Sequence, residues 1–158
     1  SNEAVKKSIP GLALMASWIG DTQVRHRGTM GGSLANNDPS ACYPAAVLAC
    51  NATIVTDRRS ITADDFFQGM FTTALEPDEI ITEVLLPAWP ADRRWGFQEF
   101  ARRRGDCALA GVAAGGAAHR FVVVGGEDHR VAGVDPGGGH HRQQLRSGRH
   151  YLPGPRQR

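Results

Sequence analysis

The sequence predicts an α+β fold assembled from short helices and strands. Its 158 residues, of which 41% are hydrophobic and 22% charged, suffice for one domain with a buried core and exclude a wholly disordered chain. Apolar residues at helical spacing occur in some segments, and runs rich in β-branched residues occur in others. Because no strand–helix–strand repeat is present, these elements predict an α+β fold.

The first elements are expected to be mostly helical. A helix capped by Ser8 and ended by Gly20 accounts for apolar residues spaced three and four apart. The segment 21–40 is dense in glycine, asparagine and aspartate, has no clean period and predicts a shaped loop. Residues 41–50 predict a short buried helix, with Pro44 inside its first turn.

Strands are expected in the next part of the chain. Residues 52–56 and 60–62 predict two short strands joined by a turn. The segment 63–71 begins with acidic residues and predicts a short helix that buries Phe66, Phe67 and Phe71. Residues 79–87 predict a further strand, because they are rich in β-branched residues and alternate in part.

Prolines and mixed charges over 87–94 predict a domain boundary. Two more strands are expected after it, over 95–103 and 108–114. Residues 119–158 then hold seven arginines, no lysine, three acidic residues and eight glycines. This tail predicts no folded element, and its composition favours an unstructured or frame-shifted segment over a basic tail that binds acidic partners.

Several classes of protein and of site are excluded by the composition. No apolar run approaches the roughly 18 residues that span a bilayer. The polar start SNEAVKKSIP lacks a secretory signal, so a cytoplasmic location is expected. The cysteines Cys42, Cys50 and Cys107 match neither a disulfide framework nor a zinc ligand set and are expected to be buried, reduced thiols. No metal site is predicted.

One segment, RGTMGGSLANNDP, has the composition of a ligand-binding loop. Adjacent Gly31 and Gly32 allow a close approach of the backbone and can direct their amides into one concavity that suits a diphosphate. Thr29 and Ser33 add hydroxyl groups at the two ends. The spacing matches neither the dinucleotide-binding G-x-G-x-x-G pattern nor the phosphate loop, so turn glycines and a ligand loop are equally compatible with it.

A longer resemblance extends the interpretation of this loop. The stretch VRHRGTMGGSLANNDPSACYPAAVLACNATIVT, followed by ADDFFQGMFTTALEPDEIITEVLLP and FARRRGDCALAGVA, resembles the flavin-binding medium subunit of molybdenum hydroxylases. This is the family of the carbon monoxide dehydrogenase medium subunit and the xanthine dehydrogenase FAD-binding subunit. The resemblance runs from about Pro10 to Val112.

The resemblance implies a fold of two α/β subdomains that hold FAD between them, followed by a small α+β domain. Residues 1–88 then correspond to the second subdomain, the first being missing, and residues 89–118 to the start of the C-terminal domain. Residues 119–158 remain the Arg/Gly/His-rich tail. The chain is therefore expected to be a fragment, partial or frame-shifted, whose middle is authentic.

The same resemblance implies where the cofactor is held. The diphosphate contacts fall on the glycine segment, at Thr29, Met30, Gly31, Gly32 and Ser33. Asn37 and Asp38 continue that wall.

Four further positions are implied near the cofactor. Ile19 stands where mammalian xanthine enzymes have an aromatic contact, and Ile81 matches an apolar position beside the flavin. Cys42 replaces an aspartate that bonds the cofactor in several relatives, and Gln98 replaces a lysine. A thiol is a poor acceptor, and the glutamine carries no charge.

The function implied is that of an FAD-binding electron-transfer subunit of a molybdenum-containing hydroxylase or dehydrogenase. Electrons would reach FAD from iron–sulfur clusters on a small subunit, after hydroxylation at a molybdenum cofactor on a large subunit. They would leave to NAD, oxygen or a quinone-type acceptor. No catalytic residue is nominated, because the cofactors carry the redox chemistry, and no nucleic acid is expected as a partner. The alternatives are an inactive fragment, or a non-enzymatic interaction module with a basic tail.

Overall fold

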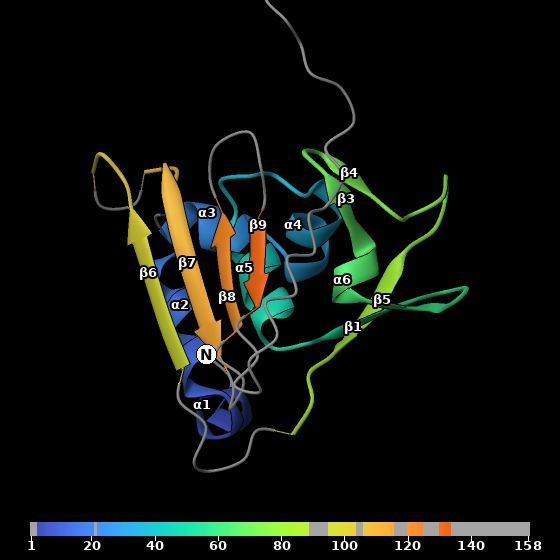
Figure 1. Ribbon diagram of the computed structural model, residues 1–158, viewed down its shortest axis with the longest axis horizontal. Coiled ribbons are helices and arrows are strands. Elements are labelled where there is room, and N and C mark those ends of the chain that lie inside the picture. The colour runs from blue at the N-terminus through green and yellow to red at the C-terminus, as the bar shows by residue number, and fades with distance from the viewer. Residues whose placement is uncertain are drawn as a thin grey trace, which may run out of the picture.

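Helices and strands alternate irregularly along the chain, and Figure 1 shows their arrangement. The computed structural model describes residues 3–20, 22–88, 95–103, 106–115, 120–124 and 130–133. Helices in these residues are α1 (Glu3–Ser8), α2 (Pro10–Trp18), α3 (Thr22–Arg27), α4 (Met30–Asn36), α5 (Cys42–Ala49) and α6 (Ala63–Phe66). Strands are β1 (Thr53–Thr56), β2 (Ser60–Thr62), β3 (Phe67–Gly69), β4 (Thr72–Thr73), β5 (Ile81–Leu85), β6 (Trp95–Phe100), β7 (Ala110–Gly115), β8 (Arg120–Val124) and β9 (Arg130–Gly133). The mixture of helices and strands confirms the predicted combination of both element types.

The helices depart from the prediction at the amino terminus and agree with it at α5. Ser8 ends α1 instead of capping the next helix, and Ile9 precedes α2 without a side-chain cap. Pro10 takes the first turn of α2, where its missing N–H costs no hydrogen bond. The predicted buried helix is α5, whose residues are buried except for Tyr43. Pro44 lies in its first turn as expected.

An antiparallel sheet of order β2-β1-β5 confirms three of the predicted strands. Its central strand, β1, pairs Ile54 with Ile61 on one side and with Val84 on the other. The segment predicted as one helix over 63–71 is instead α6 followed by the β3–β4 hairpin. Phe71 is therefore 58% exposed, not buried, because it lies in the hairpin turn with φ at 52°.

A second antiparallel sheet has the order β6-β7-β8-β9. The predicted strands over 95–103 and 108–114 correspond to β6 and β7, paired from Trp95↔Gly115 to Phe100↔Ala110. The expectation that residues 119–158 form no element is wrong for β8 and β9. The run Phe121–Val124 is one aromatic residue followed by three β-branched valines, and it continues the ladder of β7, a signal that the overall composition of the tail concealed. Residues 134–158 lie outside the described part of the chain.

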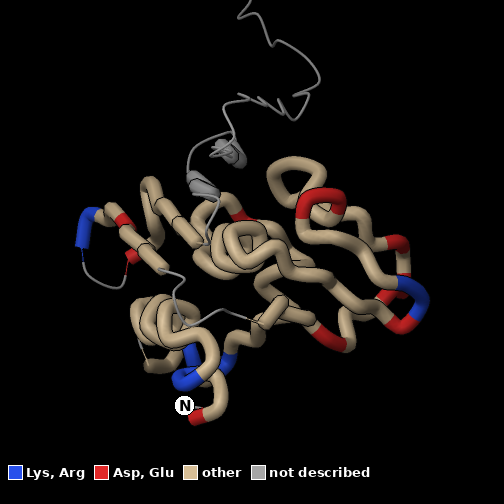
Figure 2. The backbone as a smooth tube through the Cα atoms, turned by 60° about the horizontal axis from the view of Figure 1, so that its bottom comes forward, with Lys and Arg blue, Asp and Glu red and all other residues tan. Residues whose placement is uncertain are grey.

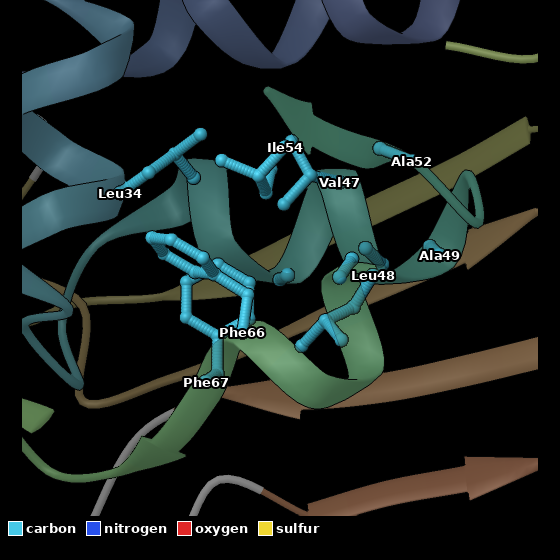
Figure 3. Packing of buried hydrophobic residues seen from close by; sticks show 11 residues of the cluster. Leu34, Val47, Leu48, Ala49, Ala52, Ile54, Phe66 and Phe67 are labelled. Carbon is cyan, nitrogen blue, oxygen red and sulfur yellow. The ribbon is translucent and has the colours of Figure 1, made fainter. Parts of the chain in front are cut away.

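Helix α5 lies between the two sheets and forms the centre of the core. Figure 3 shows the cluster, in which α5 side chains meet Leu34, Ile54 and Phe66. Ala113 of β7 is fully buried in the same cluster, so the second sheet shares this core. Burial of a side chain such as Phe66 contributes about 1.5–3 kcal/mol. No helix of the described residues is both long enough and apolar enough to cross a membrane.

An ion pair between the buried Glu79 carboxylate and the half-exposed Arg59 side chain lies at one end of the first sheet. The Glu79 carboxylate accepts hydrogen bonds from Arg59 Nε and Nη2 at 2.9 Å each, from Thr56 Oγ1 at 2.7 Å and from the Glu76 amide at 2.8 Å. Acidic and basic segments lie together here in Figure 2. The hydrogen bond to Arg59, then those to Glu76 and Thr56, lower the pKa of Glu79 from 4.5 to about 2.

We expect the ion pair of Glu79 and Arg59 to make the stability of the fold depend on pH in the acid range. Because the folded-state pKa of Glu79 is depressed, its contribution to stability is complete above pH 4.5 and is lost as pH falls toward about 2. Glu79→Gln should therefore lower the unfolding temperature at neutral pH and flatten its dependence on pH in that window. Thermal unfolding followed by circular dichroism measures both effects. Glu83→Gln, which changes an exposed carboxylate on β5, should alter neither. An unchanged pH profile in Glu79→Gln would contradict the assignment.

Candidate functional site

The glycine segment folds as a capped helix. Thr29 is extended, with φ at −124° and ψ at 152°, and its Oγ1 accepts a hydrogen bond from the Gly32 amide at 3.0 Å. At the other end Asn37 is left-handed, with φ at 45°, and its amide donates to the Ser33 carbonyl at 3.1 Å. The predicted loop over 21–40 is therefore wrong, because α3 and α4 occupy most of it. Two glycines cost α4 up to about 1 kcal/mol each, and its caps and the buried Leu34 offset that cost.

Some backbone amides of this segment have a hydrogen-bond partner within the protein, and others do not. The Gly32 amide is bonded to Thr29, so it is not part of the open nest that the sequence predicted. A Cβ at Gly32 would lie 2.9 Å from Thr29 Oγ1, so glycine at this position preserves the cap. The amides of Met30 and Gly31 come before the first intrahelical hydrogen bond, and neither has a hydrogen-bond partner among the described residues. The Thr29 hydroxyl accepts from Gly32 and keeps its own hydrogen for another acceptor.

Gly31 forms a small cradle with a strand fifty residues further along the chain. Helix α4 contacts β5, and a Cβ built on Gly31 would meet only Ile81 Cβ, at 3.9 Å, within 4 Å among the described residues. The structure thus brings together two residues that the sequence nominated separately. The space over the Gly31 backbone is filled by no side chain of the described residues, while Ile81 provides an apolar wall.

Asn37 and Asp38 lie at the opposite end of α4 from the cradle. Asn37 is fully buried, and its Nδ2 donates to the carbonyls of Gly69 at 2.6 Å and Thr72 at 3.0 Å. Its side-chain amide group therefore holds the β3–β4 turn, and its role as a cofactor contact stays a prediction. Asp38 Oδ1 accepts a hydrogen bond from the Ser40 amide at 2.8 Å, which fixes the entry to α5.

Ile19 and Cys42 meet in a second core cluster. Both lie with Leu12 and Met15 of α2, next to the first cluster. Cys42 Sγ donates a hydrogen bond to Glu99 Oε2 at 3.3 Å. Burial, followed by that hydrogen bond and the charge of Glu99, raises the pKa of Cys42 to about 12. The thiol is therefore neutral and acts as a donor, while Cys107, predicted to be buried, is exposed.

Gln98 and Glu99 occupy opposite faces of β6. Exposure alternates along this strand, with Trp95, Phe97 and Glu99 turned inward and Gln98 turned to solvent. Gln98 therefore lies on the face away from Cys42. Glu99 was not nominated from the sequence, although the alternation in WGFQEF, with aromatic residues two apart, would have placed it inward.

A shallow surface hollow lies on α3, just before the glycine segment. Thr22, Gln23, His26 and Arg27 line this open hollow, whose volume is about 280 Å³, and no nominated site residue contributes to it. Arg25 fastens this helix to the end of α2 by donating to the carbonyls of Ile19 at 3.0 Å and Gly20 at 2.9 Å. His26 is exposed, as expected for a loop or surface group. No metal-binding group of histidine, cysteine or acidic side chains occurs among the described residues.

Comparisons with known proteins relate this chain to FAD-binding domains. A family model described as the FAD binding domain in molybdopterin dehydrogenase matches residues 1–89. The nicotine 6-hydroxylase medium subunit of Paenarthrobacter nicotinovorans is 42% identical over 138 residues, covering 85% of this chain and 45% of that subunit. The carbon monoxide dehydrogenase medium chain of Hydrogenophaga pseudoflava is 38% identical over 117 residues, covering 72% of this chain and 41% of that protein.

Solved structures show the same relationship in three dimensions. Quinoline 2-oxidoreductase from Pseudomonas putida 86 superposes with a TM-score of 0.76 at 35% identity, covering 84% of this chain and 50% of that chain. Carbon monoxide dehydrogenase from Hydrogenophaga pseudoflava superposes with a TM-score of 0.73 at 35% identity, covering 78% of this chain and 47% of that chain. The chain thus spans about half the length of the relatives it matches or less.

Proposed function

This chain belongs to the family of FAD-binding domains in molybdopterin dehydrogenases, and we propose that the cradle of Gly31 and Ile81 is the part of its FAD site that holds the diphosphate. The observation that carries the proposal is the bare backbone at Gly31, with the open amides of Met30 and Gly31 and the Thr29 hydroxyl beside them. A diphosphate needs several donors without side chains in the way. The residues present fit that requirement.

Each residue of the site has a distinct task in this proposal. The amides of Met30 and Gly31 donate to phosphate oxygens, and the Thr29 and Ser33 hydroxyls add further donors. Ile81 covers one side of the bound cofactor and excludes water. When bound, FAD accepts and releases electrons, and the protein supplies position and local polarity. Ile19 provides an apolar contact, and Gln98 remains a candidate from the other face of β6.

The proposed role extends to the enzyme that contains the chain. The printed names of the relatives are those of a medium subunit or medium chain of a hydroxylase or dehydrogenase. By analogy, we assign the chain to an oxidoreductase in which a small iron–sulfur subunit delivers electrons and a large subunit carries molybdenum. Residues 1–88 are proposed as the second subdomain of the FAD-binding fold, with residues 89–118 starting the next domain. The rival hypothesis of a non-enzymatic interaction module gains no support from the comparisons.

Thr29→Val offers a direct test in the full-length polypeptide that carries this sequence. We expect FAD affinity, measured by quenching of flavin fluorescence, to fall about tenfold, because one hydrogen bond to a charged group is lost. Thr62→Val is the matched control: Thr62 caps α6 through the Asp65 amide at 3.3 Å. Loss of either cap lowers the free energy of unfolding by about 1 kcal/mol. Equal FAD affinity in both variants would exclude the Thr29 contact.

The electron-transfer role needs the assembled enzyme. Addition of the enzyme's reducing substrate should bleach the visible absorbance of the flavin, and addition of an acceptor should restore it. Persistent flavin absorbance in an otherwise active complex would remove this chain from the electron path.

A further inference from the structure

The inward face of β6 carries a carboxylate that sequence analysis did not nominate. Glu99 is half-buried, and its Oε2 accepts the hydrogen bond of the Cys42 thiol at 3.3 Å. Within the described part of the chain, no hydrogen-bond partner is recorded for Oε1 and no basic side chain forms an ion pair with Glu99. A partly desolvated carboxylate in this state gains free energy from any further donor that can reach it.

The neighbouring side chains cannot supply an equivalent acceptor. Cys42 presents S–H toward Glu99 and stays protonated, and sulfur is a weak acceptor. Gln98 lies on the opposite face of the strand. Ile19 and Phe97, which pack against the same cluster as Cys42, are apolar. Glu99 is therefore the strong acceptor where Cys42 and the inward face of β6 meet.

We propose that Glu99 is a binding residue of the flavin site, where its second carboxylate oxygen accepts a hydrogen bond from an uncharged N–H or O–H donor of the cofactor. The inference rests on the proposed FAD function. On FAD this class of donor comprises the imide N–H of the ring and the hydroxyls of the ribityl chain. Cys42 is a positioning residue in this arrangement, since its thiol holds Oε2 and thereby orients the carboxylate.

The test compares Glu99→Gln with wild type in the full-length polypeptide, using FAD and N3-methyl-FAD as probes. The amide preserves size but removes the charge, so FAD should bind about tenfold more weakly. If the donor is the imide N–H, wild type should lose affinity for N3-methyl-FAD and the variant should lose nothing further. If the donor is a ribityl hydroxyl, the variant should weaken both probes equally. Glu3→Gln, at an exposed carboxylate of α1, is the charge-matched control and should bind both probes normally.

A second readout separates binding from a purely structural role. Removing the charge of Glu99 should lower the pKa of Cys42 and speed its reaction with a thiol reagent, without changing the unfolding temperature by more than the control does. FAD affinity identical to wild type in Glu99→Gln, with a normal unfolding temperature, would overturn the inference. Failure of the wild-type polypeptide to bind FAD would instead overturn the proposed function.

A charge swap tests the pair from its other side. Cys42→Asp would place a second carboxylate within hydrogen-bond distance of Glu99, and like charges at that distance repel. We expect Cys42→Asp to weaken FAD binding, and the double variant Cys42→Asp/Glu99→Gln to recover most of the loss. Additive effects of the two substitutions would show that the side chains do not act together.

Discussion

Replacing Gly31 with valine should lower FAD affinity at least a hundredfold while leaving the fold intact. The reason is the cradle: a Cβ at this position makes only an ordinary van der Waals contact, with Ile81 Cβ at 3.9 Å, but it enters the space that the proposed diphosphate needs. Loss of two charge-assisted hydrogen bonds, at about 1.5–3 kcal/mol each, corresponds to this factor or more. Isothermal titration of the full-length polypeptide with FAD measures the change.

Alanine at the same position should separate stability from binding. Gly31 lies in the first turn of α4, where alanine is a better helix former than glycine by up to about 1 kcal/mol. Gly31→Ala should therefore be at least as stable as wild type but bind FAD more weakly. Ala35→Val adds a β-branched residue at an exposed position of the same helix and should not alter FAD binding. Tight FAD binding by Gly31→Val would remove the cradle from the site.

The parts of the fold that were predicted correctly are those with a local signal. The residue types of α5, which is an apolar run, and of β1 and β5, which are rich in β-branched residues, are enough to predict a buried helix and two strands. Helix α3 has no buried residue, and it depends on Arg25 binding the end of α2. Helix α4 contains two glycines and depends on Thr29 and Asn37. Both were missed because contacts outside the helix stabilise them.

The candidate site was also predicted only where its residues carry a local signal. The composition of the glycine segment predicted a ligand loop as one possibility. It could not predict that Gly32 lies against its own cap while Gly31 does not, because this depends on the direction in which each Cβ would point. The adjacency of Gly31 and Ile81 depends on packing of α4 against β5. Asn37 was nominated as a contact, yet its amide is used by the turn at Gly69 and Thr72. Pairings over thirty or more residues have no signal in a single sequence.

Gly11→Ala should destabilise the protein by about 1–2 kcal/mol, because it disturbs the contact of α2 with Trp95, which packs against both core clusters. The indole of Trp95, at the start of β6, lies directly on the Gly11 backbone of α2, and any Cβ there would overlap the ring. Overpacking against a rigid side chain costs about 1–3 kcal/mol, and the better helix propensity of alanine offsets only part of it. Chemical denaturation followed by tryptophan fluorescence and by circular dichroism measures the loss.

The same variant tests whether the predicted boundary at 87–94 separates two independently folding units. Trp95 and Phe97 pack against both core clusters, and Ala113 is buried with Leu34 and Ile54. If the sheets share one cooperative core, the two probes should report a single transition that moves to lower denaturant in Gly11→Ala. Gly11→Ala combined with Trp95→Leu should regain part of the loss, because the smaller side chain leaves room for the added methyl group. A transition that splits in two would show that β6–β9 folds apart from α5 and β1.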